Sequence, residues 1–507
     1  MASRNEGETT MSERGVILCI DQGTTGTTAL VLSHDLTVLA KANEEFPQHY
    51  PQPGWVEHDV EEIWSSVESS VTQALKLAEV ETDQIVAIGI TNQRETSVIW
   101  DRETSAPIHR AVVWQCRRTT AFCEGLIADG HTDRVRAKTG LVLDPYFSAT
   151  KARWTLNHVD GARARAEQGE LAFGTIDTYL IWRLTAGRVH VTDVTNASRT
   201  LLMDIHAVRW DKEMLDLFEV PQALLADIKS SSEVYGHTHG LDFLPDGIPI
   251  AGIAGDQQAA LFGQACFHPG DVKSTYGTGA FVLMNVGQRA PLSEHGLLTT
   301  IACRVGEEPV TYALEGSVFI AGAAVQWLRD ELQVIAQAPE IESLARSVED
   351  NGGVSVIPAF AGLGAPYWDP EARGAILGLT RGSNRGHIAR ATLEGIAHQV
   401  ADVVAAMSAD SRQDIGVLKV DGGAAANGLL MQVQADLLNA TVSRSAILET
   451  TALGSGLLAG LATGFWGSQQ EVVDRWREDG RFEPMEDIHN VADARAHWAR
   501  AVERVRH

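Results

Sequence analysis

Residues 15–42 read "GVILCIDQGTTGTTALVLSHDLTVLAKA", three apolar runs separated by two polar breaks. The first run, at 15–21, has the length of a strand and ends on Asp21. The two later runs flank the polar break at 33–35, a pattern typical of a hairpin. The chain is therefore predicted to open as strand, polar loop, strand, strand.

The first polar break, "DQGTTGTT" at 21–28, has the composition of a phosphate-binding turn. Its hydroxyls and amides suit phosphate oxygens, and Asp21 can hold magnesium directly or through water. An ordinary β-turn is the alternative, because Asp-x-Gly is common. Two further glycine turns, "YGTGAF" at 276–281 and "VDGGAAAN" at 420–427, also follow apolar runs, and three in this order favour phosphate binding. The sequence lacks GxxxxGK[ST] and the HRD and DFG motifs, which disfavours P-loop and protein-kinase folds.

The α/β pattern occurs twice along the chain. A helical periodicity at 60–78 and a strand pattern at 83–93 follow the first turn. A second series begins near residue 265, and its segment 417–438 again reads strand, glycine turn, helix. We expect a duplicated fold whose halves close on a shared ligand, with the boundary at 264–272.

Length and composition limit the remaining possibilities. A chain of 507 residues predicts two domains with a cleft between them. A formal charge of −25 makes nucleic acids and membrane surfaces poor partners. Five scattered cysteines without CxxC spacing predict reduced thiols in the core of a cytoplasmic protein. Residues 1–14 resemble a loose tail, and the uncharged run at 450–470 suits a tightly packed buried helix better than a membrane span.

Asp256 stands in "AGIAGDQQAALFG" (251–263), between a glycine-rich apolar strand and an apolar helix start. A general base needs a carboxylate at a strand end, facing a hydroxyl and shielded from bulk water. Helix N-capping by the same side chain is the common alternative. Together with Asp21, it would supply one carboxylate to metal and one to substrate, as phosphoryl transfer requires.

Arg94 and Glu95 lie side by side in "GITNQRETSVIW" (89–100), at the end of an expected strand. A small polyol needs a fixed donor fork and a fixed acceptor, and this pair supplies both. Trp114 and Tyr146 can add a flat apolar wall. The alternatives are a solvated surface pair for the two charges and core packing for the two rings.

Stretches along nearly the whole chain resemble one known family. They include "YPQPGWVEHD" (50–59), "HVTDVTNASRT" (190–200) and "PAFAGLGAPYWDP" (358–370), besides the turns already quoted. The sequence is similar to the FGGY carbohydrate kinases, of the actin-like ATPase superfamily, and among them to the branch that phosphorylates glycerol. The resemblance implies an α/β fold of two ribonuclease-H-like ATPase domains with an interdomain cleft. Residues 15–264 would hold the glycerol site and first phosphate loop, and residues 265–507 the second phosphate turn and adenosine site.

The resemblance also implies ATP-dependent phosphorylation of glycerol to sn-glycerol 3-phosphate, with Mg²⁺ as cofactor, Asp256 as general base and a homodimer or homotetramer as the assembly. The residues that it implies for glycerol are Arg94, Glu95, Trp114, Tyr146, Asp256, Gln257 and Phe281. Those assigned to the nucleotide are Thr24, Thr25, Gly26, Thr28, Thr278, Gly322, Gln326, Gly423 and Asn427, and those assigned to the metal are Asp21 and Asp256.

Two positions depart from the family pattern. Many members carry an arginine where this chain has Thr28, and threonine cannot bring that charge to phosphate. The loop 236–247 contains no lysine or arginine, so control by a sugar bisphosphate is not expected. His237 and His239 leave control by histidine phosphorylation open, although plain surface histidines are the more common case.

Two other functions remain as alternatives. One is a kinase of a longer polyol or ketose, which the apolar side chains Trp114 and Phe281 disfavour. The other is a non-catalytic nucleotide switch or chaperone-type module, which has no use for Arg94, Glu95, Tyr146 and Asp256 together.

Overall fold

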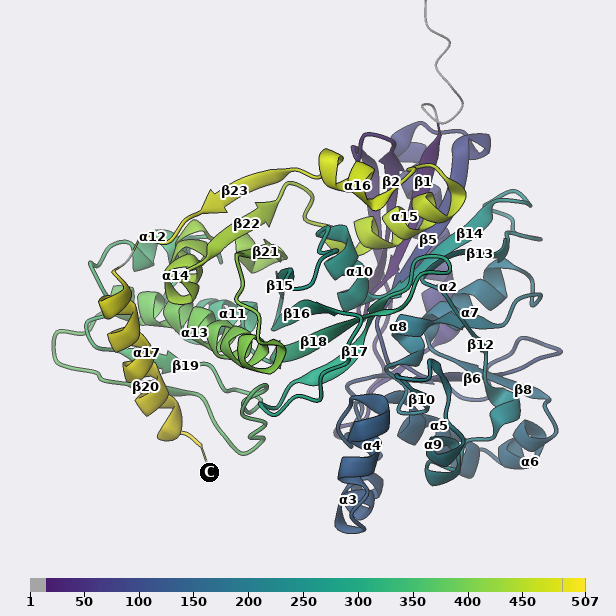
Figure 1. The fold of residues 1–507 in the computed structure, drawn as a ribbon, viewed down its shortest axis with the longest axis horizontal. Helices are drawn as coiled ribbons and strands as arrows, with labels where there is room; N and C mark the ends of the chain where they lie inside the picture. Colours follow the sequence, from purple (N-terminus) through teal and green to yellow (C-terminus); the bar gives the residue numbers. More distant parts are fainter. Residues whose placement is uncertain (1–14, 486, 507) are drawn as a thin grey trace, which may run out of the picture. The chain divides into compact units, whose positions relative to one another are not determined.

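The structure is a computed structural model that describes residues 15–485 and 487–506 (Figure 1). The predicted tail at 1–14 lies outside the described residues. The chain forms two compact units and passes from the first to the second between Ala265 and Cys266. Unit 1 also includes Thr300–Thr311 and Thr450–Trp476. Both segments lie within residues 265–507, the second half of the division expected from the sequence. Unit 2 comprises the other described segments.

A six-stranded sheet forms the centre of unit 1, in the order β13-β14-β5-β1-β2-β3. Strand β1 pairs antiparallel with β2 and parallel with β5, and β5 in turn pairs parallel with β14. The predicted opening of strand, loop, strand, strand is confirmed. The strands span Val16–Gln22 (β1), Gly26–Ser33 (β2), Val38–Glu45 (β3), Ile85–Asn92 (β5), Ser232–His237 (β13) and Pro249–Gly255 (β14).

Helices cover both faces of this sheet, which explains why β1 is apolar from Val16 to Ile20, on both of its faces. Alternate residues Val16, Leu18 and Ile20 belong to the core shared with α2 (Val60–Ala78). On the other face, a Cβ added to Gly456 of α15 (Thr450–Thr463) would lie 2.4 Å from the Cys19 sulfur. Strand β1 is therefore buried from both sides.

Helix α15 packs on the sheet at backbone distance. A Cβ on Gly89 would lie 2.2 Å from the carbonyl oxygen of Ser455, and one on Gly252 would lie 2.4 Å from the same atom. Such contacts require glycine. The prediction of a tightly packed buried helix within 450–470 is confirmed. Among the described residues, no helix has both the length and the hydropathy needed to cross a membrane.

Unit 2 repeats the same arrangement in a seven-stranded sheet, β17-β18-β16-β15-β21-β22-β23. Strand β15 pairs antiparallel with β16 and parallel with β21, as β1 does with β2 and β5. The expected duplicated α/β fold is confirmed. The strands span Val272–Tyr276 (β15), Ala280–Gly287 (β16), Leu298–Cys303 (β17), Thr311–Val318 (β18), Val417–Asp421 (β21), Thr441–Ser445 (β22) and Glu478–Phe482 (β23).

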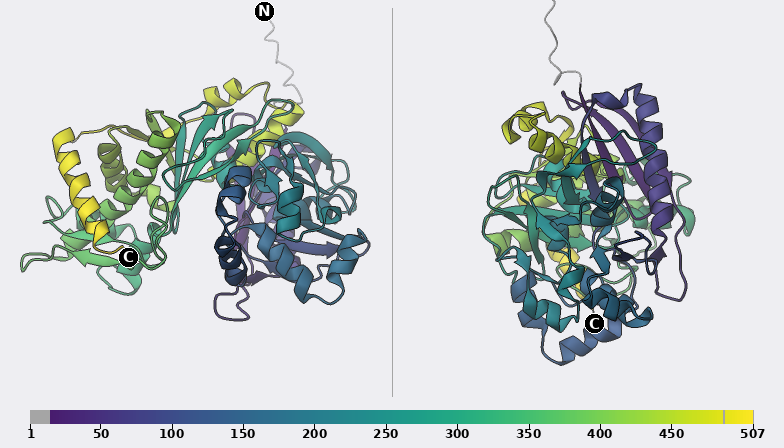
Figure 2. Two further views of the ribbon diagram at one scale, coloured as in Figure 1. Left: turned by 60° about the horizontal axis from the view of Figure 1, so that its bottom comes forward. Right: turned by 90° about the vertical axis from the view of Figure 1, so that its right-hand side faces the viewer.

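The long helix α13 (Arg385–Ser411) packs against α14 (Gly428–Leu438) and α17 (Ile488–Glu503) in unit 2 (Figure 2). His398 of α13 stacks on Trp498 of α17, with ring centroids 5.0 Å apart. The remaining helices are α3 (Thr120–Ala128), α4 (Thr132–Thr139), α5 (Ser148–His158), α6 (Ala162–Glu167), α7 (Ile176–Leu184), α8 (Val194–Ala197), α9 (Lys212–Leu217), α10 (Asp256–Gly263), α11 (Gly322–Asp330), α12 (Glu340–Ala345) and α16 (Gln469–Arg475). The short strands are β4 (Glu57–His58), β6 (Val98–Asp101), β7 (Ala111–Val112), β8 (Leu171–Gly174), β9 (Val191–Asp193), β10 (Met203–Asp204), β11 (Arg209–Trp210), β12 (Asp227–Lys229), β19 (Ser355–Ile357) and β20 (Ala375–Leu377).

All five cysteines are free thiols, as expected. Cys19, Cys116, Cys123 and Cys266 are buried, whereas Cys303 is only half-buried, so the expectation of five core residues is wrong for Cys303.

Candidate active site

Three parallel strands of unit 1 end at the same edge of the sheet. The register aligns Gln22 of β1 with Asn92 of β5, and Asn92 with Gly255 of β14. Asp256 follows the end of β14 directly, and Arg94 lies one residue beyond Gln93 after the end of β5. Ligands of open α/β sheets bind at this edge, so the topology selects it as the candidate site.

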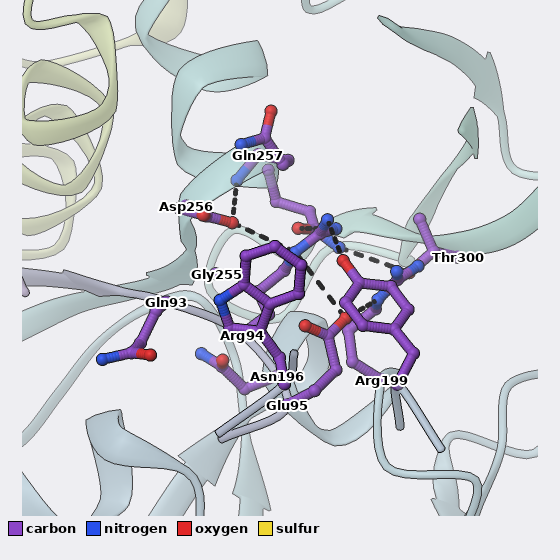
Figure 3. Close-up of polar contacts among 12 residues, drawn as sticks. Gln93, Arg94, Glu95, Asn196, Arg199, Gly255, Asp256, Gln257 and Thr300 are labelled. Atoms are coloured by element: carbon purple, nitrogen blue, oxygen red, sulfur yellow. Dashed lines mark hydrogen bonds and ion pairs between the residues drawn. The ribbon is translucent and has the colours of Figure 1, made fainter. Parts of the chain in front are cut away.

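Arg94 is buried, with 2% of its side chain exposed, and its guanidinium contacts several side chains (Figure 3). Its Nε lies 3.0 Å from Asp256 Oδ1, its Nη1 donates to Gln258 Oε1 at 3.1 Å, and its Nη2 lies 3.5 Å from the Tyr146 hydroxyl. The alternative of a solvated surface pair with Glu95 is therefore wrong. Burial at several fixed contacts makes the guanidinium a pre-positioned donor fork.

Glu95 is equally buried, with 1% of its side chain exposed. Its Oε1 accepts a hydrogen bond from Arg199 Nε at 2.7 Å and lies 3.9 Å from Arg94 Nε. Its backbone has a φ of +63°, and the hydroxyls of Ser97 and Ser148 donate to its carbonyl oxygen at 3.2 and 3.0 Å. These contacts hold a strained backbone in place, a feature that clusters at functional sites.

Asp256 is the first residue of α10, and 33% of its side chain is exposed. Gly255, not Asp256, is the N-cap of this helix, so the capping alternative is wrong. The Asp256 carboxylate instead accepts the Gln257 amide at 2.7 Å and pairs with Arg94. Gly255 permits this contact, because a Cβ there would lie 2.7 Å from the Arg94 Cγ and Cδ atoms.

Two aromatic side chains complete this part of the site. The rings of Trp114 and Tyr146 meet edge to face, with centroids 5.6 Å apart, and both residues are half-buried. The indole Nε1 of Trp114 donates to Thr24 Oγ1 at 3.0 Å. This bond joins the ring pair to the first glycine turn.

The first glycine turn is braced by the loop that follows β3. Gln48 Nε2 donates to the Thr24 carbonyl at 3.0 Å, and the Phe46 amide donates to that of Thr25 at 3.2 Å. His58 bonds to Gln48 Oε1 at 2.7 Å, and burial lowers the pKa of His58 to about 4. A neutral imidazole thus supports the turn at physiological pH.

The other predicted residues of this turn lie within unit 1. Thr25 is exposed and Gly26 begins β2. Thr28 is half-buried and accepts a hydrogen bond from Asn43 Nδ2 at 3.0 Å. Asp21, also half-buried, pairs with Thr28 in the β1–β2 register. Among residues 15–485 and 487–506, no three His, Cys, Asp or Glu side chains gather as a metal-binding group, and the assignment of Asp21 and Asp256 to the metal stays a prediction.

Unit 2 brings its own predicted residues to the ends of β15 and β21. The Gly322 amide donates to the Gly277 carbonyl at 2.9 Å, and the Ala321 amide donates to that of Thr278 at 2.8 Å. Asn427 caps α14 through Leu430 N at 2.9 Å. Gln326 is exposed on α11, Gly423 is exposed, and Phe281 is half-buried on β16.

Sequence reasoning missed several contributors to the site. Arg199, Gln258 and Thr300 received no role, yet Gln258 Nε2 donates to Thr300 Oγ1 at 3.2 Å while its oxygen holds Arg94. Lys151 was also missed; its Nζ donates to the Phe147 carbonyl at 2.9 Å, and burial lowers its pKa to about 7. The stretch at 190–200 contained the signal for Arg199, but its spacing alone indicates no chemistry.

Comparisons with known proteins now identify the family. Residues 16–263 match the N-terminal domain of the FGGY family of carbohydrate kinases, and residues 272–463 match its C-terminal domain. The chain belongs to the FGGY family of carbohydrate kinases. The chain is therefore a kinase, and its α/β fold is the expected one.

Two curated relatives that match nearly the whole chain are glycerol kinases. The glycerol kinase of Trichlorobacter lovleyi is 57% identical over 96% of this chain and 98% of its own. The glycerol kinase of Symbiobacterium thermophilum is 57% identical over 97% of this chain and 99% of its own.

Solved structures agree on the fold. The Plasmodium falciparum glycerol kinase with ADP matches 97% of this chain and 98% of its own at 37% identity, with a TM-score of 0.91. A xylulose kinase from Lactobacillus acidophilus reaches a TM-score of 0.86 at 20% identity over 96% of this chain and 97% of its own, a likeness of fold alone. Family membership sets aside the non-catalytic nucleotide switch.

Proposed function

We propose that this FGGY kinase transfers the γ-phosphoryl group of ATP to a terminal hydroxyl of glycerol, giving sn-glycerol 3-phosphate and ADP, with Asp256 as the general base. The names of the relatives above support the substrate. The contact of 3.0 Å between Arg94 Nε and Asp256 Oδ1 carries the assignment of the site. We further expect the cytoplasmic location and the homodimer or homotetramer that the sequence suggests.

The charged pair after β5 suits a small triol. Each hydroxyl of glycerol both donates and accepts, so Arg94 can donate to one oxygen while Glu95 accepts from a neighbouring hydroxyl. Both side chains are almost fully buried and held by other groups. Their positions are fixed before substrate arrives, which lowers the entropic cost of binding.

Asp256 has the environment of a base that meets its substrate. Its carboxylate is one-third exposed, so a hydroxyl can reach it, and Arg94 together with the Gln257 amide fixes its direction. As the substrate oxygen bonds to the γ-phosphorus, its proton passes to Asp256. The bond from phosphorus to the bridging oxygen breaks, and ADP leaves with that electron pair.

The three glycine turns, together with α11, would hold the nucleotide. In unit 1 this assigns Thr24, Thr25, Gly26 and Thr28, and in unit 2 Thr278, Gly322, Gln326, Gly423 and Asn427. Asp21 would hold Mg²⁺, whose charge, when bound, screens the phosphate oxygens. One half-buried carboxylate beside threonine hydroxyls fits this ion, because kinase Mg²⁺ takes most of its ligands from phosphate and water.

The apolar wall would set the substrate length. The rings of Trp114 and Tyr146 offer carbon surface and few polar partners for the hydroxyls of a longer chain. We therefore assign Trp114 and Tyr146, with Gln257 and Phe281, to glycerol. A panel of glycerol, four-carbon and five-carbon polyols tests this assignment, and preference for a longer substrate would contradict it.

The direct test of Asp256 is the variant Asp256→Asn. Asparagine keeps the shape but cannot take up the proton, so turnover should fall roughly a hundredfold or more while glycerol still binds. A coupled assay of ADP formation with and without glycerol measures turnover, and calorimetry measures glycerol binding. Asp216→Asn is the control, because Asp216 is an exposed partner of Lys212 on α9. Turnover near that of wild type in Asp256→Asn would refute the role.

A further inference from the structure

We propose that Arg199 is a positioning residue of the substrate site, which holds Glu95 and Tyr146 in the arrangement that binds a small triol. This inference rests on the proposed function, because it concerns the same site. Arg199 would act through these two residues, without contacting the reacting atoms.

The first observation is a row of alternating charges, Arg199, Glu95, Arg94 and Asp256 (Figure 3). Arg199 Nε lies 2.7 Å from Glu95 Oε1, whereas Arg94 Nε lies 3.9 Å from that oxygen and 3.0 Å from Asp256 Oδ1. Arg199 thus neutralises Glu95, which leaves Arg94 to direct Asp256. Without Arg199, two carboxylates would share Arg94, and the guanidinium would shift toward Glu95.

Burial raises the energetic importance of the ion pair between Arg199 and Glu95. The side chain of Arg199 is 0% exposed and that of Glu95 is 1% exposed. Loss of Arg199 would remove the nearest cation from the buried Glu95 carboxylate, and breaking a buried ion pair is far costlier than breaking a surface pair. Arg199 therefore has a larger effect on Glu95 than its distance from the substrate suggests.

The second observation is the contact of Arg199 with aromatic rings. Its guanidinium carbon lies 5.7 Å from the ring centroid of Tyr146 and 5.3 Å from that of Phe147. These distances lie within the range of cation–π attraction. One guanidinium thus contacts both the acceptor Glu95 and the ring that forms part of the apolar wall.

The third observation is that the segment carrying Arg199 is fixed to the strand ends. Asp193 caps α8 through the amides of Thr195 and Asn196, at 3.0 and 2.9 Å. Thr195 Oγ1 accepts the Gly255 amide at 2.9 Å, and the side-chain amides of Asn196 and Asn92 bond to each other at 3.0 and 3.1 Å. The segment before Arg199 is therefore hydrogen-bonded to Asn92 and Gly255, the last residues of the strands that precede Arg94 and Asp256.

The variant Arg199→Gln tests the proposal. We expect the dissociation constant for glycerol, measured by calorimetry, to rise by tenfold to about a hundredfold, as for loss of a hydrogen bond to a charged group. The KM for ATP should stay within about twofold, because Arg199 contacts Glu95 and Tyr146, which are assigned to glycerol and not to the nucleotide. A purely structural defect would instead weaken the binding of both substrates, ATP as well as glycerol.

Arg153→Gln is the matched control. Arg153 lies on α5, and its guanidinium carbon also lies over an aromatic ring, 4.0 Å from the ring centroid of Phe122. Its Nη2 forms an ion pair with Glu219 Oε1 at 3.0 Å. Its contacts include none of the residues assigned to glycerol. We expect the dissociation constant for glycerol and the KM for ATP of this variant to match those of wild type.

A double-mutant cycle identifies the route of the effect. In a Glu95→Gln background, Arg199→Gln should weaken glycerol binding by a smaller factor than in the wild-type background, because one of the two residues through which Arg199 acts is already altered. If Arg199→Gln does not fold, Arg199→Lys decides, since it keeps the charge and loses the planar fork; we expect a loss of threefold to tenfold.

Wild-type affinity for glycerol in either Arg199 variant would overturn the proposal, as would equal losses for ATP and glycerol. A wild-type enzyme without glycerol-dependent ADP formation would instead overturn the proposed function, so the two failures are distinguishable.

Discussion

The two sheets share a strand order, but their corresponding strand ends carry different chemistry. In unit 1, β5 continues into Gln93, Arg94 and Glu95, which are buried. In unit 2, the corresponding strand β21 continues into Gly422 and Gly423. The same edge of the fold thus presents fixed side-chain charges in one unit and main-chain atoms in the other. The repeated fold supplies the location, and the few residues after each strand supply the chemistry.

The glycines of unit 2 are not equivalent. Gly422 has φ +87° and ψ 165°, a conformation that only glycine adopts readily, and a Cβ there would lie 2.5 Å from the Tyr276 carbonyl oxygen. A Cβ on Gly423 would meet nothing within 4 Å. Gly422 therefore has a structural role, whereas the role proposed for its neighbour Gly423 is to contact the nucleotide.

The largest effect expected from this comparison is that of Gly422→Ala. Strain and overlap should lower the free energy of unfolding by about 3 kcal/mol, measured by urea denaturation. Gly423→Ala is its control and should change that free energy by less than about 0.5 kcal/mol while raising the KM for ATP. Equal stability of the two variants would contradict the distinction.

A smaller effect is expected on the pH dependence of stability, where one buried group in each unit contributes with the opposite sign. Burial raises the pKa of Asp177 in unit 1 to about 7 and lowers the pKa of His398 in unit 2 to about 3. The folded state thus holds the Asp177 proton between about pH 4 and 7, where the unfolded state has lost it, so this term weakens stability as pH rises. For His398 the unfolded state holds the extra proton up to about pH 6.5, so stability rises with pH.

The variants Asp177→Asn and His398→Gln separate these two terms. Relative to wild type, the free energy of unfolding of Asp177→Asn should increase from pH 4 to 7, and that of His398→Gln should decrease from pH 4 to 6.5. Denaturation at several pH values measures both. Slopes of the same sign would contradict the opposite titrations.

The smallest effect is expected at Thr28. Thr28→Arg would add a positive charge to the first turn and should lower the KM for ATP by roughly threefold to tenfold, with the KM for glycerol unchanged. Steady-state kinetics with each substrate varied in turn would measure this. An unchanged KM for ATP would show that residue 28 does not reach the phosphates.

Local pattern was sufficient to predict much of the fold. The apolar run before Asp21 and the polar break at 33–35 specify β1 and the β2–β3 hairpin, because strands and tight turns depend on nearby residues. The return of 450–476 to unit 1 was not predictable in this way. Contacts such as that of Gly456 with Cys19 join residues more than four hundred positions apart, and no local pattern records them.

The candidate site was predictable to the same extent. Arg94, Glu95 and Asp256 stand at the ends of apolar runs, so their place at one sheet edge follows from sequence and topology. Which charge pairs with which did not follow. Adjacent in sequence, Arg94 and Glu95 pair chiefly with Asp256 and Arg199, because the strained backbone at Glu95 sends its carboxylate toward a different element.

A crystal structure of the enzyme with glycerol bound tests the central claim most directly. The account predicts a terminal hydroxyl within about 3.2 Å of the Asp256 carboxylate, with the other hydroxyls on Arg94 and Glu95. Glycerol bound elsewhere in unit 1, or with no hydroxyl near Asp256, would contradict it.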